Sequence, residues 1–261
     1  PGTDPFTVLL LQHMKRPAHI PVEDQGSRFI TTEDHVRCWK RASEYTSAGI
    51  SGLHFGMFKA QAQDPEIAAY DASRRSLMYS TGTTFPRWNS SADCMLMKSS
   101  GDTRAHKLRT VVLLEADFNM NNKKSGREAM WTAERHNCIA REKGGGRRDH
   151  KSSESSLNLV LLNDDSRFKR KAISICSNDA KGCFDRIVHS VAFICLRRFG
   201  IPQPPLTSMF QCIQQMEHHI RTGFGDSDNT YGPSSYTGAH PNQGCLQGNG
   251  ASGAAWTAVS T

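Results

Sequence analysis

The sequence lacks long apolar runs and closely paired cysteines. None of its eight cysteines forms a Cys-X-X-Cys pair, which argues against a zinc knuckle. Reduced thiols are the simplest interpretation; the even number would permit disulfides, although a chain of this length does not need them. We find no signal-peptide pattern and no stretch long enough to cross a membrane. We therefore expect an intracellular protein, in the nucleus or cytoplasm, that is not secreted and has no membrane partner.

Apolar residues are scarce and positive charge is in excess. They make up 37% of the 261 residues, which is little for a core of this size, and the net charge is +7. Such a charge suits a polyanionic partner. A mildly basic protein without such a partner fits the composition equally well.

The most informative segment is Ser174-Ile-Cys-Ser-Asn-Asp-Ala-Lys-Gly-Cys-Phe-Asp-Arg-Ile-Val-His189. The alternating apolar run 172–176 predicts a short strand that ends just before Asp179. We expect Asp185 to open an amphipathic helix, more as its N-cap than as a ligand. Its apolar positions are Ile187, Val191 and Ile194.

Four segments together resemble the reverse transcriptase family, in that family's order. The stretch Asp179-Ala-Lys-Gly-Cys-Phe-Asp185 resembles motif A, especially of the retroelement and group II intron type. Three others resemble an early fingers motif, the fingers hairpin and motif B, and they are Ser51–Lys59, Trp88–Asn119 and Gln247–Gly253. At Gly253 most members of the family have a proline. The resemblance spans about residues 50 to 261.

The resemblance implies an α+β fold with the fingers and a partial palm of a right-hand polymerase. The palm would be an incomplete antiparallel sheet with helices on one face. We expect residues 1–30 to be a poorly ordered lead and 31–170 to form the fingers region, with a mobile basic loop at 141–156. Residues 171–261 would form the partial palm, with motifs A and B.

The implied activity is RNA-templated DNA synthesis by two-metal nucleotidyl transfer. Its partners would be an RNA template, a DNA primer and a deoxynucleoside triphosphate, and its cofactors two Mg²⁺ ions, with Mn²⁺ possible. The family's motif C, an aromatic-X-Asp-Asp hairpin, does not follow motif B before Thr261, and Asp164-Asp165 precedes motif A. We therefore expect the isolated chain to be inactive. The alternative is a decayed retroelement relic that retains at most nucleic-acid binding.

Within the segment that resembles motif A, individual residues carry the implied chemistry. Asp179 is the expected metal ligand, helped by the backbone carbonyl of Ala180; the alternative is an aspartate that caps a turn. By resemblance Phe184 is the steric gate that excludes a 2′-hydroxyl, and the alternative is a core aromatic.

The remaining predicted site residues come from the fingers and motif B. Arg109 and Lys98 would close over the triphosphate, although two basic residues on a hairpin are commonly a solvated face. Lys107 is a weaker candidate. Gln247 and Gly248 belong to the motif B loop, with Gln243-Gly244 as a competing register. For Arg147 and Arg148 a solvated basic loop fits as well as a nucleic-acid contact. The histidines show no ligand spacing, so surface or core positions are the default for His189, His218 and His219.

Local patterns predict the remaining elements. Caps predict helices that begin at Thr31 or Thr32 and at Asp64. We also expect strands at 93–98 and 107–114, helices within 119–141, 157–168 and 206–216, and a helix ended by Gly200. Residues 221–236 are expected to form a long turn.

Overall fold

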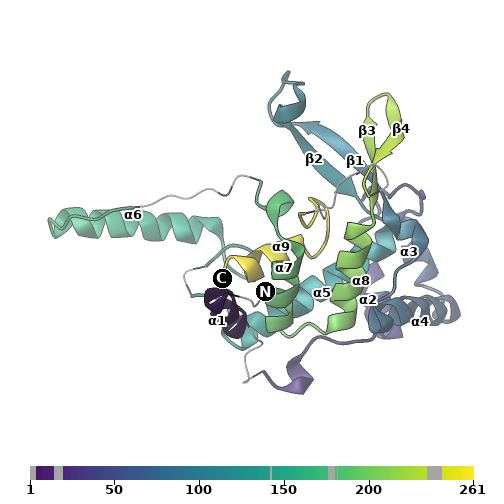
Figure 1. Ribbon diagram of the computed structural model, residues 1–261, viewed down its shortest axis with the longest axis horizontal. Helices are drawn as coiled ribbons and strands as arrows, with labels where there is room; N and C mark the ends of the chain where they lie inside the picture. Colours follow the sequence, from purple (N-terminus) through teal and green to yellow (C-terminus); the bar gives the residue numbers. More distant parts are fainter. Residues whose placement is uncertain (1–3, 15–19, 142, 176–179, 181, 234–242) are drawn as a thin grey trace.

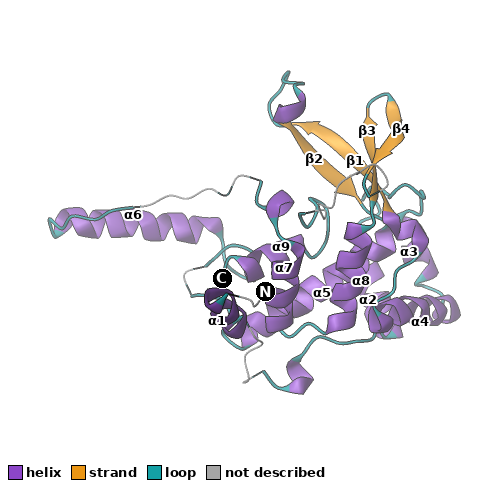
Figure 2. Ribbon diagram, viewed as in Figure 1, coloured by secondary structure: helices purple, strands orange, loops and turns teal. Residues whose placement is uncertain are grey.

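The computed structural model describes residues 4–14, 20–141, 143–175, 180, 182–233 and 243–261 (Figure 1). Helices make up most of the described chain, and the strands gather at one end (Figure 2). The helices are α1 (Pro5–His13), α2 (Thr32–Lys40), α3 (Phe55–Gln61), α4 (Pro65–Thr81), α5 (Ala116–Arg135), α6 (Ser152–Phe168), α7 (His189–Arg198), α8 (Gln203–Gln214) and α9 (Ser252–Val259). The strands are β1 (Ser90–Met97), β2 (Leu108–Leu113), β3 (Glu217–Thr222) and β4 (Gly225–Tyr231).

Sequence signals account for most helix boundaries. Thr31 accepts a hydrogen bond from the amide of Asp34 and caps α2, and Asp64 caps α4, with Pro65 in its first turn. Gly200, with a φ of +86°, follows α7 as predicted. These helices and the two fingers strands confirm the predictions made for them.

The strands form one mixed sheet within the described residues, in the order β2-β1-β3-β4. β1 pairs antiparallel with β2 but parallel with β3, and β3 pairs antiparallel with β4. The predicted antiparallel sheet is therefore wrong in one pairing. A parallel pair needs a long crossover, and helices α5 to α8 supply it between β2 and β3.

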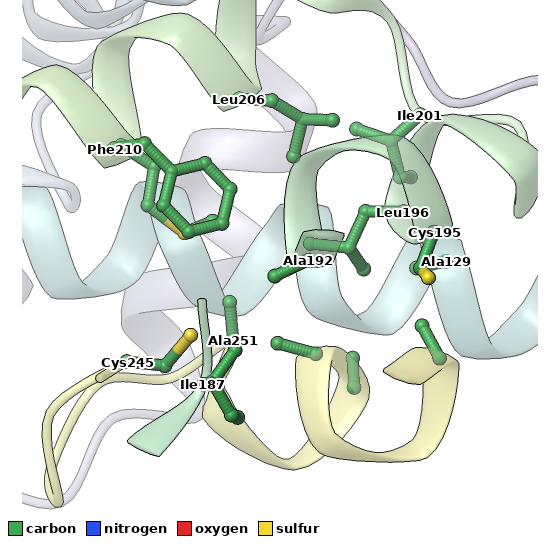
Figure 3. Packing of buried hydrophobic residues seen from close by; sticks show 14 of the residues in the cluster. Ala129, Ile187, Ala192, Cys195, Leu196, Ile201, Leu206, Phe210, Cys245 and Ala251 are labelled. Carbon is green, nitrogen blue, oxygen red and sulfur yellow. The ribbon is translucent and has the colours of Figure 1, made fainter. Parts of the chain in front are cut away.

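The main core lies where α5, α7, α8 and α9 meet (Figure 3). Leu196 from α7 and Leu206 and Phe210 from α8 pack toward small residues of α5 and α9, including Ala129 and Ala251. A second cluster joins α2 and α3, where the rings of Trp39 and Phe58 stack with centroids 4.7 Å apart. The small residues let four helices approach closely despite the low apolar content.

Several predictions are corrected. Residues 172–175, the described part of the expected motif A strand, form no strand, and the following helix begins at His189 rather than Asp185. Asp185 instead lies in a 3₁₀ turn, Phe184–Arg186. The segment expected as a long turn from 221 carries the end of β3 and all of β4.

Two further corrections concern segments that were expected to lack helices. The expected lead 1–30 contains α1 and the buried side chains of Ile20 and Ile30. The expected mobile loop 141–156 is only partly loop, because α6 already begins at Ser152. In the described part of the chain, none of the helices combines the length and apolar character that a membrane span requires.

Candidate functional site

A cleft of about 360 Å³ opens on one face of the sheet, where the sheet meets two loops of the helical body. Its walls come from all four strands, from the turn at Asp185, from α8 and from loop 243–248. The lining residues are Asp93, Thr110, Val112, Asp185, Ile213, His218, Tyr231, Gln243, Leu246 and Gln247. The cleft thus brings together segments that the sequence assigns to motif A, to motif B and to the fingers.

The turn 184–187 and the loop 243–248, which resemble motifs A and B in sequence, are joined by hydrogen bonds. The amide of Gly244 donates to the carbonyl of Ile187 at 2.9 Å, and that of Cys245 donates to the carbonyl of Phe184 at 2.8 Å. Gly244 has a φ of +93°, and a Cβ there would lie 2.9 Å from Cα of Asp185. This close approach requires glycine.

The same loop is also fixed to strand β2 and to α5. The amide of Val112 on β2 donates to the carbonyl of Gln247 at 2.7 Å. The side chain of Asn119 on α5 donates to the carbonyl of Gly248 at 2.9 Å and accepts from the amide of Gly250 at 2.6 Å. At Gly248 φ is +125°, and a Cβ would collide with the carbonyl oxygen of Val112. The predicted motif B glycine is therefore needed where the loop crosses β2.

A buried polar cluster forms the floor of the cleft. The carboxylate of Asp93 accepts from His218 Nδ1 at 3.0 Å, from the hydroxyl of Ser91 at 3.3 Å and from the hydroxyl of Tyr231. The rings of His218 and Tyr231 stack with centroids 4.9 Å apart. Because a carboxylate only accepts, Nδ1 of His218 is the donor in its contact with Asp93.

Sequence reasoning missed this cluster. The register that aligns Ser91 with His218, and His218 with Tyr231, depends on the parallel pairing of β1 and β3, which local patterns do not predict. The alternation of Ser91 and Asp93 with apolar neighbours was the available signal.

His189 is hydrogen-bonded to the loop 243–248. Its Nε2 donates to the carbonyl of Gly244 at 2.6 Å, and its Nδ1 accepts from the side-chain amide of Gln214. Burial lowers the pKa of His189, which favours the neutral ring. His189 is buried, which decides between the surface and core positions that the sequence left open.

The predicted basic residues of the fingers are exposed. Thr110 and Val112 line the cleft, so alternation along β2 puts Arg109 on the opposite face of the sheet. Lys98 directly follows β1. Arg147, in contrast, donates to both carboxylate oxygens of Glu134 at 2.7 Å and belongs to the helical body. The triphosphate contacts assigned to Arg109 and Lys98 stay predictions.

The motif A residues divide between two surfaces. Phe184 is partly buried and packs against the main core, while its neighbour Asp185 is exposed to the cleft. Ala180 lines a second cavity, of about 350 Å³, beside α7 and α9. Asp179, the predicted metal ligand, lies outside the described residues.

The carboxylates of the described residues do not suit a magnesium centre. Asp93 already accepts three hydrogen bonds, and Asp185 is the other carboxylate that lines the cleft. Among described residues, no group of three or more His, Cys, Asp or Glu side chains comes together for a metal. We therefore derive no metal-dependent step from this part of the chain.

Known protein families and curated proteins offer no relative. A scan against protein-family models finds no match to this chain, and a search of curated proteins finds none either.

Proposed function

We propose that the cleft binds a nucleotide and that the chain forms the fingers and part of the palm of a reverse-transcriptase-type polymerase. One observation carries the proposal: the loop 244–248 is hydrogen-bonded both to the turn 184–187 and to strand β2, and all three segments border a single cleft. These are the segments whose sequences resemble motif A, motif B and the fingers.

The chemistry of the cleft suits a nucleotide. Its volume of about 360 Å³ falls within the range typical of small-molecule sites. Val112, Ile213 and Leu246 offer apolar surface to a base or sugar, and the amides of Gln243 and Gln247 can exchange hydrogen bonds with base edges. Deoxynucleoside triphosphate would be the substrate, with an RNA template and a DNA primer.

The proposal predicts that the chain binds deoxynucleoside triphosphates. Gln247→Ala removes a side-chain amide but keeps the backbone carbonyl that holds Val112, so affinity should fall about 3- to 10-fold with the fold intact. Gln211→Ala, on the exposed side of α8, is the matched control and should bind like the wild type. Isothermal titration would measure both. Equal affinity in Gln247→Ala and the wild type would count against this cleft.

Catalysis needs a separate test. When this chain is continued by an aromatic-X-Asp-Asp hairpin, Mg²⁺-dependent extension of a DNA primer on RNA is expected, and Asp179→Ala should abolish it. Extension that survives Asp179→Ala would contradict the polymerase proposal.

The rival proposal is a relic that only binds nucleic acid. The replacement of the family's proline by Gly253 favours it. Salt-dependent RNA binding without any nucleotide binding would support the relic over the polymerase.

A further inference from the structure

The sheet ends in two loops that point the same way. Because β1 and β3 are parallel neighbours, the loop after Met97 and the turn after Thr222 leave the sheet at the same end, at the top of Figure 1. Cys94 on β1 pairs with Arg221 on β3. Beyond this pair, β1 continues for three residues to Met97 and β3 for one residue to Thr222. The β1–β2 loop therefore extends further than the β3–β4 turn beside it.

The β3–β4 turn presents a bare aromatic ring. Phe224 is 105% exposed and stands between Gly223 and Gly225, where an added Cβ would meet nothing within 4 Å. Its amide donates to the hydroxyl of Thr222 at 3.2 Å. The ring is therefore open to a partner that can stack on its face.

The β1–β2 loop at the same end of the sheet is basic. Between 98 and 109 it carries four Lys or Arg residues and one Asp. Arg104 pairs with that Asp, whereas no carboxylate among the described residues pairs with Lys98, Lys107 or Arg109, all of which are exposed. On the hairpin, Asp226 is neutralised by Arg221 at 2.5 Å.

We propose that this end of the sheet, Phe224 with Lys98, Lys107 and Arg109, binds single-stranded nucleic acid. The cations would contact successive phosphates, and the ring of Phe224 would stack on an unpaired base. Charge complementarity selects a polyanion, and the exposed ring selects unpaired bases over a duplex, whose base faces are already stacked. The proposal does not depend on the nucleotide cleft, which lies at the other end of these strands and is lined by different residues.

The test measures fluorescence anisotropy of the whole chain with a labelled oligouridylate of about 15 nucleotides, over a range of salt concentrations. Phe224→Ala should weaken binding about 5- to 20-fold with the salt dependence unchanged, because stacking releases no counterions. Phe224→Tyr should restore affinity. In Lys98→Gln/Lys107→Gln the slope of log affinity against log salt should shrink by about 1.4, since each phosphate contact on a single strand contributes about 0.7.

Matched controls are available elsewhere on the surface. Tyr45 is 100% exposed in the loop after α2, and Tyr45→Ala should bind like the wild type. The double variant Lys40→Gln/Lys151→Gln removes two exposed charges outside the sheet and should keep the wild-type slope. Deoxynucleotide titration of Phe224→Ala should match the wild type, which separates this surface from the cleft.

Several results would overturn the proposal. Wild-type affinity in Phe224→Ala or in Phe224→Leu would exclude base stacking, because leucine keeps apolar bulk without a ring. Equal loss of affinity for a duplex probe in Phe224→Ala would exclude selection of unpaired bases. Binding to anionic vesicles that needs Phe224, without binding to the oligouridylate, would assign the surface to a membrane.

Discussion

Helices α5 and α6 are similar in length but opposite in their relation to the protein. α5 is polar in sequence, yet it lies at the centre of the fold and buries Asp117, Asn121 and Lys124 beside its apolar residues. α6 carries a run of leucine and valine, yet it projects away from the body (Figure 1), and in its described side chains only Ser166 is buried. From composition alone, one would expect α6 to be buried and α5 to be exposed.

The difference arises because α5 supplies hydrogen-bond partners as well as buried apolar side chains such as Phe118. Asp117 accepts from the indole nitrogen of Trp88 at 2.9 Å and from the guanidinium of Arg87, which also donates to Glu115 at 2.8 Å. Glu115 in turn accepts from Ser51. Buried polar groups are tolerated when each is hydrogen-bonded, and here they tie the early fingers segment to α5.

Among the buried polar residues of α5, the largest loss in the free energy of unfolding is therefore expected at Asp117. Asp117→Ala leaves the indole of Trp88 and part of the Arg87 guanidinium without their acceptor, so the free energy of unfolding should fall by about 3 kcal/mol or more. Urea unfolding followed by circular dichroism measures it. Asp164→Ala, on the exposed surface of α6, is the matched control, with an expected change within about 0.5 kcal/mol. Similar losses in the two variants would contradict the contrast between the helices.

A pH-dependent change in the free energy of unfolding, of intermediate size, is expected from His35, which lies next to α5. Nδ1 of His35 accepts from Arg75 at 3.1 Å, and Arg75 donates to Asn121 on α5 at 2.8 Å. Burial, aided by the charges of Arg75 and Arg74, lowers the pKa of His35 from 6.5 to about 3. Between these values the unfolded chain binds a proton that the folded protein does not, so stability falls as the pH falls through this window.

His35→Gln tests this linkage. One proton contributes up to about 1.4 kcal/mol per pH unit, so between about pH 6 and about pH 5 the variant should lose stability less steeply than the wild type by roughly that amount. Urea unfolding at the two pH values gives the slopes. Glutamine can still accept from Arg75, which limits the loss at neutral pH. Identical slopes would show that His35 takes up its proton without unfolding.

The comparison also shows what local sequence can predict. Caps at Thr31 and Asp64 and the paired strands of the fingers act within a few residues, and each was predicted correctly. The parallel pairing of β1 with β3 joins segments far apart in the chain, so the cluster of Asp93, His218 and Tyr231 was missed.

In the candidate site too, features that depend on contacts between distant segments could not be predicted. Gly248 was predicted to contact a nucleotide, which stays a prediction, whereas the structure shows its close approach to Val112 on β2. Asp185 was predicted to cap a helix, but Phe184–Arg186 forms a 3₁₀ turn that places it in the cleft. A turn held by Gly244 and Cys245 from another segment could not be inferred from motif A alone.

The smallest change in the free energy of unfolding is expected for a substitution on α6. Leu161 is 56% exposed, so Leu161→Ala removes little buried surface and replaces leucine with a better helix former. We expect a change in the free energy of unfolding within about 0.5 kcal/mol, against about 3–5 kcal/mol for Phe118→Ala on α5, where the ring is 1% exposed. Urea unfolding of both variants measures the two values. A loss above about 1 kcal/mol in Leu161→Ala would show that α6 packs its leucines against the protein in solution. The contrast between a buried polar helix and an exposed apolar one would then fail at α6 rather than at α5.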